Sequence, residues 1–392
     1  MTTRGNAVLR RILIANRGEI AVRIIATCRR LGIATVLAAS DADLDSVPAR
    51  LADRVVRIGP APATASYLDV SAVIAAARAE RVDAMHPGYG FMAENPRLAE
   101  ACPAAEIVFI GPTAEQLRAV GDKLMARRLA VVAGLPAADG GEAVSVDEAT
   151  ALARDLGLPV LIKAVGGGGR GLARLDDPAD LRATLDRSMA EAQAAFRDAR
   201  VYLERFITSA RHIEVQVLGD GARVIHLGER DRSVQRRYQK LMEEAPAPGL
   251  DDRLRADIRR APVDFSRHLA YRGAGTVEFL VDRARGTFAF RERHARILVE
   301  QPVTEMVCGV DLIAEQIAVA EGRQLRLAQE DVTMTGHAIE CRITAEDWTR
   351  GFQPSPGTVS TAAFPAGEGI RVDTHLQAGA TVRRTTTRCL PS

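Results

Sequence analysis

The segment Arg11-Ile-Leu-Ile-Ala15 begins an alternation of short apolar runs and helical patterns that decides the fold class. It predicts a buried strand, Ile20–Leu31 predicts an amphipathic helix that ends at Gly32, and Ala34–Ala39 predicts the next strand. The pattern continues with one helix and two extended segments, over Val70–Arg78, Val82–Met85 and Ile107–Ile110. Strands that alternate with helices indicate βαβ units and a parallel sheet.

A second unit follows a stretch rich in Gly, Pro and Ala, Gly134–Gly141, which predicts a hinge. Beyond the hinge, Ser145–Leu156 predicts a helix with Ser145 as its cap, Val160–Ala164 a strand, and Pro178–Arg197 a long helix. From about residue 214 strands dominate, with predicted segments over Glu214–Leu218, Val224–Leu227, Thr276–Val281 and Thr287–Phe290. The fold class is therefore α/β and α+β.

Composition excludes several classes of protein. The 392 residues are 47% hydrophobic and 26% charged, which argues against disorder. The net charge is only +2, so the overall charge does not favour nucleic-acid binding. No apolar run approaches the ~20 residues of a membrane helix, and Met1–Arg10 lacks the apolar core of a secretory signal. The five scattered cysteines fit neither a disulfide framework nor a zinc site. We expect a cytoplasmic protein without nucleic-acid or membrane partners.

Lysine is rare in this chain. Of the 52 basic residues only Lys123, Lys163 and Lys240 are lysines. A lysine that persists in an arginine-rich chain can mark a place where a compact point charge fits and a planar guanidinium does not. Chance survival is the alternative at this point.

Two further patterns are compatible with phosphate chemistry. The glycine run in Lys163-Ala-Val-Gly-Gly-Gly-Gly-Arg-Gly171 follows a strand and suits a backbone cradle for phosphate, although a flexible loop explains it equally well. Glu278 and Glu292 lie on neighbouring strands of hairpin character, where they either hold Mg²⁺ or are paired surface acids. Arg296 and Glu300 either flank a small anion or form an exposed ion pair.

Several long motifs in one order resemble the biotin carboxylase family, the subunit or domain found in acetyl-CoA, propionyl-CoA and pyruvate carboxylases. They are Ile14-Ala-Asn-Arg-Gly-Glu-Ile20, His86-Pro-Gly-Tyr-Gly-Phe91 with Glu94-Asn95, the Gly166–Gly171 loop, Glu229-Arg-Asp231 with Gln235-Arg-Arg237, Glu243-Glu-Ala-Pro-Ala-Pro248, Gly273-Ala-Gly-Thr276, Pro302-Val-Thr-Glu-Met306 and Glu340-Cys-Arg342.

The resemblance implies an ATP-grasp fold with three domains. An N-terminal α/β domain would occupy 1–120, a linker and small lid 121–213, and an incomplete C-terminal α+β domain 214–392, with an atypical tail over 383–392. It implies ATP-dependent carboxylation of biotin with bicarbonate through carboxyphosphate, using Mg²⁺ or Mn²⁺ and biotin carried in trans. The implied partners are a biotin carboxyl carrier protein and a carboxyltransferase component, with a homodimer where the C-terminal domain is intact.

The resemblance also assigns roles to individual residues. ATP contacts are implied for Lys123, Lys163, Gly168, Gly169, Glu204, Ile207, His212 and Gln235. The implied bicarbonate clamp is Lys240, Arg296 and the backbone at Val299; Glu300 resembles the base that deprotonates bicarbonate, and Arg342 the group that steadies the biotin enolate. All three lysines thus fall on implied site positions, which weakens the chance explanation.

The chain departs from the family pattern at several positions. His294 replaces an asparagine that ligates Mg²⁺ beside Glu278 and Glu292, and imidazole is a poor ligand for this hard cation. Leu298 replaces a glutamine near bicarbonate, Tyr238 replaces a histidine, and the glycine loop is one residue short.

The tail from Val382 to Ser392 matches what deletion of one nucleotide would produce from the family's usual Val-Pro-Pro-Tyr-Tyr-Asp-Ser-Leu-Leu-Ala-Lys. We therefore expect an out-of-frame tail, an exposed apolar edge on the C-terminal sheet and poor solubility.

Three functional interpretations remain open at this stage. One is a working biotin carboxylase, and the second is a degenerate nucleotide-binding relative whose carboxylation is impaired or lost. The third, an ATP-grasp ligase for a different acid, is disfavoured by Glu300, Lys240 and Arg342.

Overall fold

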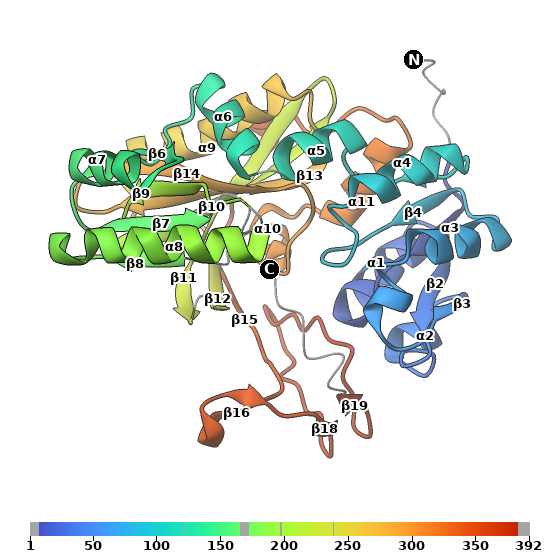
Figure 1. The fold of residues 1–392 in the computed structure, drawn as a ribbon. Coiled ribbons are helices and arrows are strands. Elements are labelled where there is room, and N and C mark those ends of the chain that lie inside the picture. Colours follow the sequence, from blue (N-terminus) through green and yellow to red (C-terminus); the bar gives the residue numbers. More distant parts are fainter. Residues whose placement is uncertain (1–7, 122, 165–171, 197, 238, 383–392) are drawn as a thin grey trace. The chain divides into compact units, whose positions relative to one another are not determined.

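The computed structural model describes residues 8–121, 123–164, 172–196, 198–237 and 239–382 (Figure 1). The chain divides into two compact units. Unit 1 comprises Met1–Gly121, Glu214–Val277 and Arg293–Pro391, and unit 2 comprises Asp122–Ile213 and Glu278–Glu292. The three-domain division at 120/121 and 213/214 remains a proposal. The expected tail over 383–392, and the glycine run with Gly168 and Gly169, lie outside the described residues.

The N-terminal part of unit 1 is a parallel sheet with the strand order β3-β2-β1-β4-β5. Its strands are β1 (Arg11–Ile14), β2 (Ala34–Ser40), β3 (Arg54–Gly59), β4 (Ala84–His86) and β5 (Val108–Phe109). The helices of this region are α1 (Gly18–Arg30), α2 (Val47–Leu51), α3 (Val70–Ala79), α4 (Pro96–Ala104) and α5 (Ala114–Gly121), with a 3₁₀ turn, η1 (Ala63–Ala65). The predicted βαβ units and parallel sheet are confirmed.

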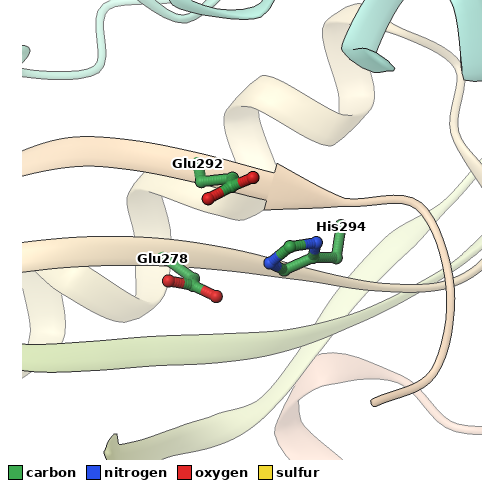
Figure 2. A group of neighbouring side chains, drawn as sticks. All are labelled: Glu278, Glu292 and His294. Atoms are coloured by element: carbon green, nitrogen blue, oxygen red, sulfur yellow. The ribbon is translucent and has the colours of Figure 1, made fainter. Parts of the chain in front are cut away.

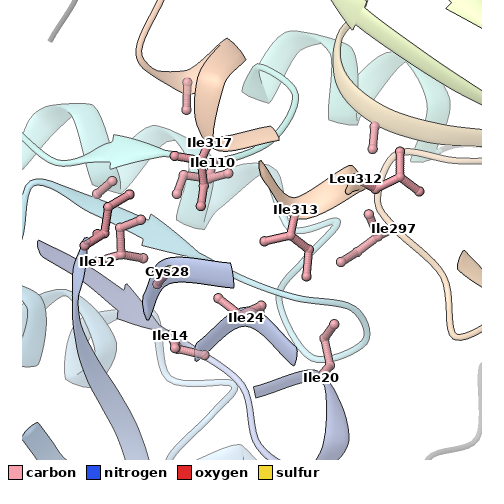
Figure 3. Packing of buried hydrophobic residues seen from close by; sticks show 14 of the residues in the cluster. Ile12, Ile14, Ile20, Ile24, Cys28, Ile110, Ile297, Leu312, Ile313 and Ile317 are labelled. Atoms are coloured by element: carbon pink, nitrogen blue, oxygen red, sulfur yellow. The ribbon is translucent and has the colours of Figure 1, made fainter. Parts of the chain in front are cut away.

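Alternation along β1 sends side chains into two separate cores. Ile12 and Ile14 pack on one side of the sheet with α1 and α11 (Leu312–Ala320), as Figure 3 shows. The apolar residues of α1 recur every three or four positions and so share one face of the helix. Ile24, on this face, is fully buried. Leu13, which points to the opposite face, packs with α3 and α4.

Unit 2 contains an antiparallel sheet with the strand order β6-β9-β7-β8. Its strands are β6 (Gly140–Ala143), β7 (Val160–Ala164), β8 (Leu172–Leu175) and β9 (Val201–Arg205), and its helices are α6 (Lys123–Val132), α7 (Val146–Leu156) and α8 (Leu181–Phe196), which follows η2 (Pro178–Asp180). The predicted cap is confirmed, because the Ser145 hydroxyl accepts the Glu148 N–H at 3.2 Å. The predicted long helix begins as a 3₁₀ turn at Pro178.

A six-stranded sheet with the order β14-β13-β10-β11-β12-β15 carries six of the predicted site residues, namely His212, Gln235, Lys240, Glu278, Glu292 and His294. The strands are β10 (Ala210–Asp220), β11 (Val224–Arg236), β12 (Gln239–Ala245), β13 (Arg272–Asp282), β14 (Thr287–His294) and β15 (Ala338–Cys341). The helices α9 (Asp252–His268) and α10 (Gln301–Cys308) precede and follow β13 and β14 in the chain. All four strands predicted beyond residue 214 lie inside these longer strands.

Beyond β15 the regular structure is sparse. Up to residue 382 it consists of β16 (Glu346–Asp347), η4 (Trp348–Arg350), β17 (Gln353–Pro354), β18 (Gly357–Thr358) and β19 (Thr381–Val382), while η3 (Gln329–Asp331) precedes β15. At the edge strand β15 and just after it, Ile339 is 58% and Ile343 84% exposed, as expected for an apolar edge. None of the helices in the described part of the chain has the length and apolar character to span a membrane.

Candidate active site

Two of the sequence motifs meet where β1 and β4 end, within unit 1. The Asn16 side chain donates to the carbonyls of Pro87 and Tyr89, both at 2.7 Å. Gly88 has φ +63°, and a Cβ there would lie 2.8 Å from the Asn16 amide nitrogen. Only glycine therefore fits this approach, since the left-handed backbone and the short contact both exclude a side chain. The ends of parallel strands commonly carry binding loops. In this protein the hydrogen bonds of Asn16 hold the loops after β1 and β4 in one conformation.

The predicted nucleotide residues of unit 2 lie on its antiparallel sheet and at its end. Lys163 on β7 and Glu204 on the adjacent β9 form an ion pair, with side chains that are 36% and 14% exposed. Ile207 lies two residues after the end of β9 and is half-buried. The structure thus brings Lys163 and Glu204 together, as expected for groups on neighbouring strands.

The remaining predicted nucleotide residues are spread over both units. Lys123 begins α6, but its side chain lies outside what the structure describes, as does Tyr238. His212, at the start of β10, lies 2.7 Å from the Arg291 guanidinium, measured from Nδ1 to Nη1. Gln235 lies in unit 1 and is described with Lys240 below.

The three predicted metal ligands gather on the hairpin of β13 and β14 (Figure 2). One ligand atom each of Glu278, Glu292 and His294 lies within 4.8 Å of the others. Two carboxylates fit Mg²⁺, which is commonly held by one or two acids and otherwise by water and phosphate oxygens. The His294 nitrogen fits Mg²⁺ less well, and it would suit Mn²⁺ better.

The predicted anion clamp lies in unit 1. Arg296, in the loop after β14, donates from Nε to the Glu94 carboxylate at 3.0 Å, and the Ala295 N–H reaches the same carboxylate at 2.8 Å. Burial raises the pKa of Glu94, but Arg296 and His294 outweigh it and hold that pKa below its usual value. The ionised Glu94 therefore fixes the guanidinium that the resemblance assigns to bicarbonate.

The second cation of the clamp is held by an amide. Lys240 on β12 donates from Nζ to the Gln235 carbonyl oxygen at 3.1 Å, and the two residues are paired across β11 and β12. Both side chains are half-buried, as is Val299, while Leu298 beside it is 4% exposed. The Gln235 amide thus positions the Lys240 ammonium group beside β11.

Glu300 is the buried acid of this part of the site. Its side chain is 1% exposed and lies 2.8 Å from the guanidinium groups of both Arg232 and Arg342. Arg342 also forms an ion pair with Glu243. Burial raises the pKa of Glu300, but Arg232, Arg342 and Arg230 outweigh it and hold the pKa well below its ordinary value. The carboxylate is thus ionised at neutral pH, as a proton acceptor must be.

Sequence reasoning missed the partners that hold these groups. Glu94 and Glu243 were seen only as parts of motifs, Arg232 was not singled out, and none of the three received a role. Glu94 and Arg296 are 202 residues apart in the chain, so no local pattern connects them. The signal that was present is that Glu94 and Glu243 lie inside the quoted motifs and that Arg232 directly follows Glu229-Arg-Asp231.

Comparison with known proteins identifies each part of the chain. Residues 8–117 match the family model for the biotin carboxylase N-terminal domain, residues 122–328 that for the carbamoyl-phosphate synthase L chain ATP-binding domain, and residues 340–386 that for the biotin carboxylase C-terminal domain. The chain is 50% identical over 380 residues to the biotin carboxylase of Pseudomonas aeruginosa. This alignment covers 96% of this chain and 84% of the relative.

Solved structures give the same result. The biotin carboxylase of Campylobacter jejuni in a beta-gamma-ATP complex aligns with a TM-score of 0.90 and 43% identity over 96% of this chain and 84% of that one. The biotin carboxylase domain dimer of the 2-oxoglutarate carboxylase from Hydrogenobacter thermophilus, in complex with MgADP, ADP and bicarbonate, aligns with a TM-score of 0.89 and 40% identity over the same shares.

Proposed function

The chain belongs to the biotin carboxylase family, and we propose that it carboxylates biotin with bicarbonate at the expense of ATP. The observation that carries this proposal is the buried Glu300 carboxylate with Arg342 at 2.8 Å. The cations Lys240 and Arg296 lie in the same unit, each held by a side chain that leaves it charged. A base, an anion clamp and a cation for a developing enolate are the groups that this reaction needs.

Bicarbonate is a poor electrophile and must be activated first. Transfer of the γ-phosphoryl group of ATP to a bicarbonate oxygen yields carboxyphosphate and ADP. The bond between the carboxyl carbon and the phosphate oxygen then breaks, and the released phosphate takes the proton of the ureido nitrogen of biotin. The deprotonated nitrogen bonds to the carboxyl carbon. Positive groups stabilise the charge on the transferring phosphoryl group. We assign Lys123 and Lys163 to the phosphates, with Gly168 and Gly169 as the lid contact.

Other residues orient the substrates. We assign Glu204 and Ile207 to the adenine, and His212 and Gln235 to the rest of the nucleotide. Lys240, Arg296 and the backbone at Val299 bind bicarbonate, whose proton passes from its hydroxyl to the ionised Glu300. The Arg342 guanidinium stabilises the oxygen of the biotin enolate.

A divalent cation belongs to this chemistry. Glu278 and Glu292 would hold Mg²⁺, with His294 as the third group, and the ion supplies charge neutralisation to the phosphate oxygens when bound. The carboxylate pair fits that role.

The relatives suggest the wider setting. We propose that the biotin arrives on a carrier protein, that a carboxyltransferase takes up the carboxyl group, that the chain pairs with a second copy, and that it works in the cytoplasm. The dimeric domain from Hydrogenobacter thermophilus supports the pairing for that relative. No comparison favours the degenerate alternative, and the described site keeps Glu300, Lys240 and Arg342 together in one unit.

The test is phosphate release from ATP by the full chain with free biotin. Release should require both bicarbonate and biotin, and Glu300→Gln should lower it by about 10²–10⁴-fold because a positioned base is lost. Glu330→Gln, which changes an exposed acid, is the matched control. Hydrolysis that is indifferent to bicarbonate and biotin would contradict the proposal.

A further inference from the structure

The Glu340 carboxyl group lies beside the Glu300–Arg342 pair and has no role in the proposed reaction. Glu340 on β15 stands directly opposite Glu243 on β12. Residues in register on an antiparallel pair project from the same face with neighbouring side chains, so two ionised acids there repel one another. Glu243 is ion-paired with Arg342, whereas one carboxyl oxygen each of Glu243 and Glu340 is buried without a hydrogen-bond partner among the described residues.

The charges of this cluster do not balance when every acid is ionised. Arg230 and Arg232 pair with Glu214, Arg232 and Arg342 with Glu300, and Arg342 with Glu243. Among the described residues, the cluster that these ion pairs join therefore holds, together with Glu340, four carboxyl groups and three guanidinium groups. An unpaired buried charge is expensive, and one proton removes it.

We propose that Glu340 is a positioning residue that holds this proton at neutral pH and shares it with Glu243 across β12 and β15. A neutral Glu340 leaves Glu243 and Glu300 as the acids that hold Arg342. The inference rests on the proposed function, in which Arg342 faces the biotin enolate.

Electrostatics of the surroundings supports the assignment of the proton. Burial, and then the charges of Glu243 and Glu300, raise the pKa of Glu340 to about 9, although Arg342 and Arg230 oppose the rise. Burial also raises the pKa of Glu243, with Arg342 opposing. Glu340 is the better holder of the proton because Glu243 has the guanidinium as its partner.

The pH dependence of unfolding tests the proton directly. Native Glu340 would hold a proton that the unfolded chain releases above its ordinary pKa, so the stability contribution is lost as pH rises toward about 9. Relative to Glu340→Gln, which stays neutral, the unfolding equilibrium constant of the unaltered chain should rise tenfold per pH unit between about 5 and 9. For the control Glu330→Gln, the unfolding equilibrium constant should change with pH in parallel with that of the unaltered chain. Parallel curves for Glu340→Gln would overturn the proposal.

The pH profile of phosphate release with bicarbonate and biotin tests the positioning role. The unaltered chain should lose activity about tenfold per unit above pH 9, and Glu340→Gln should keep its activity there. If Glu340→Gln lost activity above pH 9 as the unaltered chain does, the proton on Glu340 would not be what positions Arg342. A chain without activity at any pH would contradict the proposed function, and the unfolding comparison would still decide whether Glu340 is protonated.

Discussion

At the scale of single residues, the site depends on partners that hold each charge in place. Glu94 binds Arg296 through Nε, and the Ala295 N–H fixes the same carboxylate. Arg342 lies between Glu243 and Glu300. A guanidinium with a fixed partner loses little conformational freedom when an anion arrives.

Removal of the Glu94 charge should weaken bicarbonate binding. Glu94→Gln keeps the shape but loses a charge-assisted hydrogen bond to Arg296, worth about 1.5–3 kcal/mol. We expect the KM for bicarbonate to rise about tenfold or more with a smaller change in kcat, measured by phosphate release. Glu100→Gln, on the exposed face of α4, is the control. An unchanged KM would show that Arg296 needs no partner.

Two substitutions in the site should limit the rate. His294 offers nitrogen where two carboxylates offer oxygen, and Leu298 is buried and apolar beside Val299. Loss of one preorganised polar group typically costs about 10²–10³ in rate. The double change His294→Asn with Leu298→Gln should therefore raise kcat with Mg²⁺ and reduce any advantage of Mn²⁺. Equal turnover of the two proteins would show that the substitutions are harmless.

At the scale of elements, sequence patterns predicted what local physics determines. The strands β1, β2, β4 and β5 and the helices α1 and α3 follow from apolar periodicity, and the cap at Ser145 follows from its hydroxyl, whereas β3, α2, α4 and α5 were not predicted. The 3₁₀ start at Pro178 was missed because proline and a polar first turn satisfy both helix types. Glu94, Arg232 and Glu243 were missed because their roles arise from contacts between distant segments.

The end of β4 should make folding sensitive to acid. His86 is fully buried and accepts the Gly88 N–H at Nδ1 at 3.0 Å, and burial lowers its pKa to about 4. The native state resists a proton that the unfolded chain binds, so stability is present above about pH 6.5 and is lost as pH falls toward 4.

For His86 this loss should amount to about 1.4 kcal/mol per pH unit in the unfolding free energy. Urea titrations at several pH values between 4 and 7 give the unfolding free energy as a function of pH. The slope of this plot should correspond to the uptake of one proton fewer on unfolding in His86→Gln than in the unaltered chain. His268→Gln, at the end of α9, is the control. The same slope in His86→Gln would place the acid sensitivity elsewhere, with His226 as the first candidate, since burial lowers its pKa to about 4 as well.

At the scale of the whole molecule, the sequence predicted family and fold, and the comparisons confirm both. The motifs were sufficient because they are long and ordered along nearly the entire chain. The domain boundaries and the individual site roles stay predictions. The described residues do bring Lys163 to Glu204, and Glu300 to Arg342.

The last prediction concerns where biotin is attached. Biotin is joined to a lysine side chain, and this chain has only Lys123, Lys163 and Lys240. Lys163 is ion-paired with Glu204 and Lys240 is held by Gln235, while Lys123 begins a helix and not the Met-Lys-Met turn of a carrier. A blot of this polypeptide with streptavidin, after expression with an active biotin ligase, should therefore be blank, with a biotinylated carrier protein as the positive control. A biotinylated band would mean that one of these lysines is an attachment site, and it would remove that lysine from the roles proposed here.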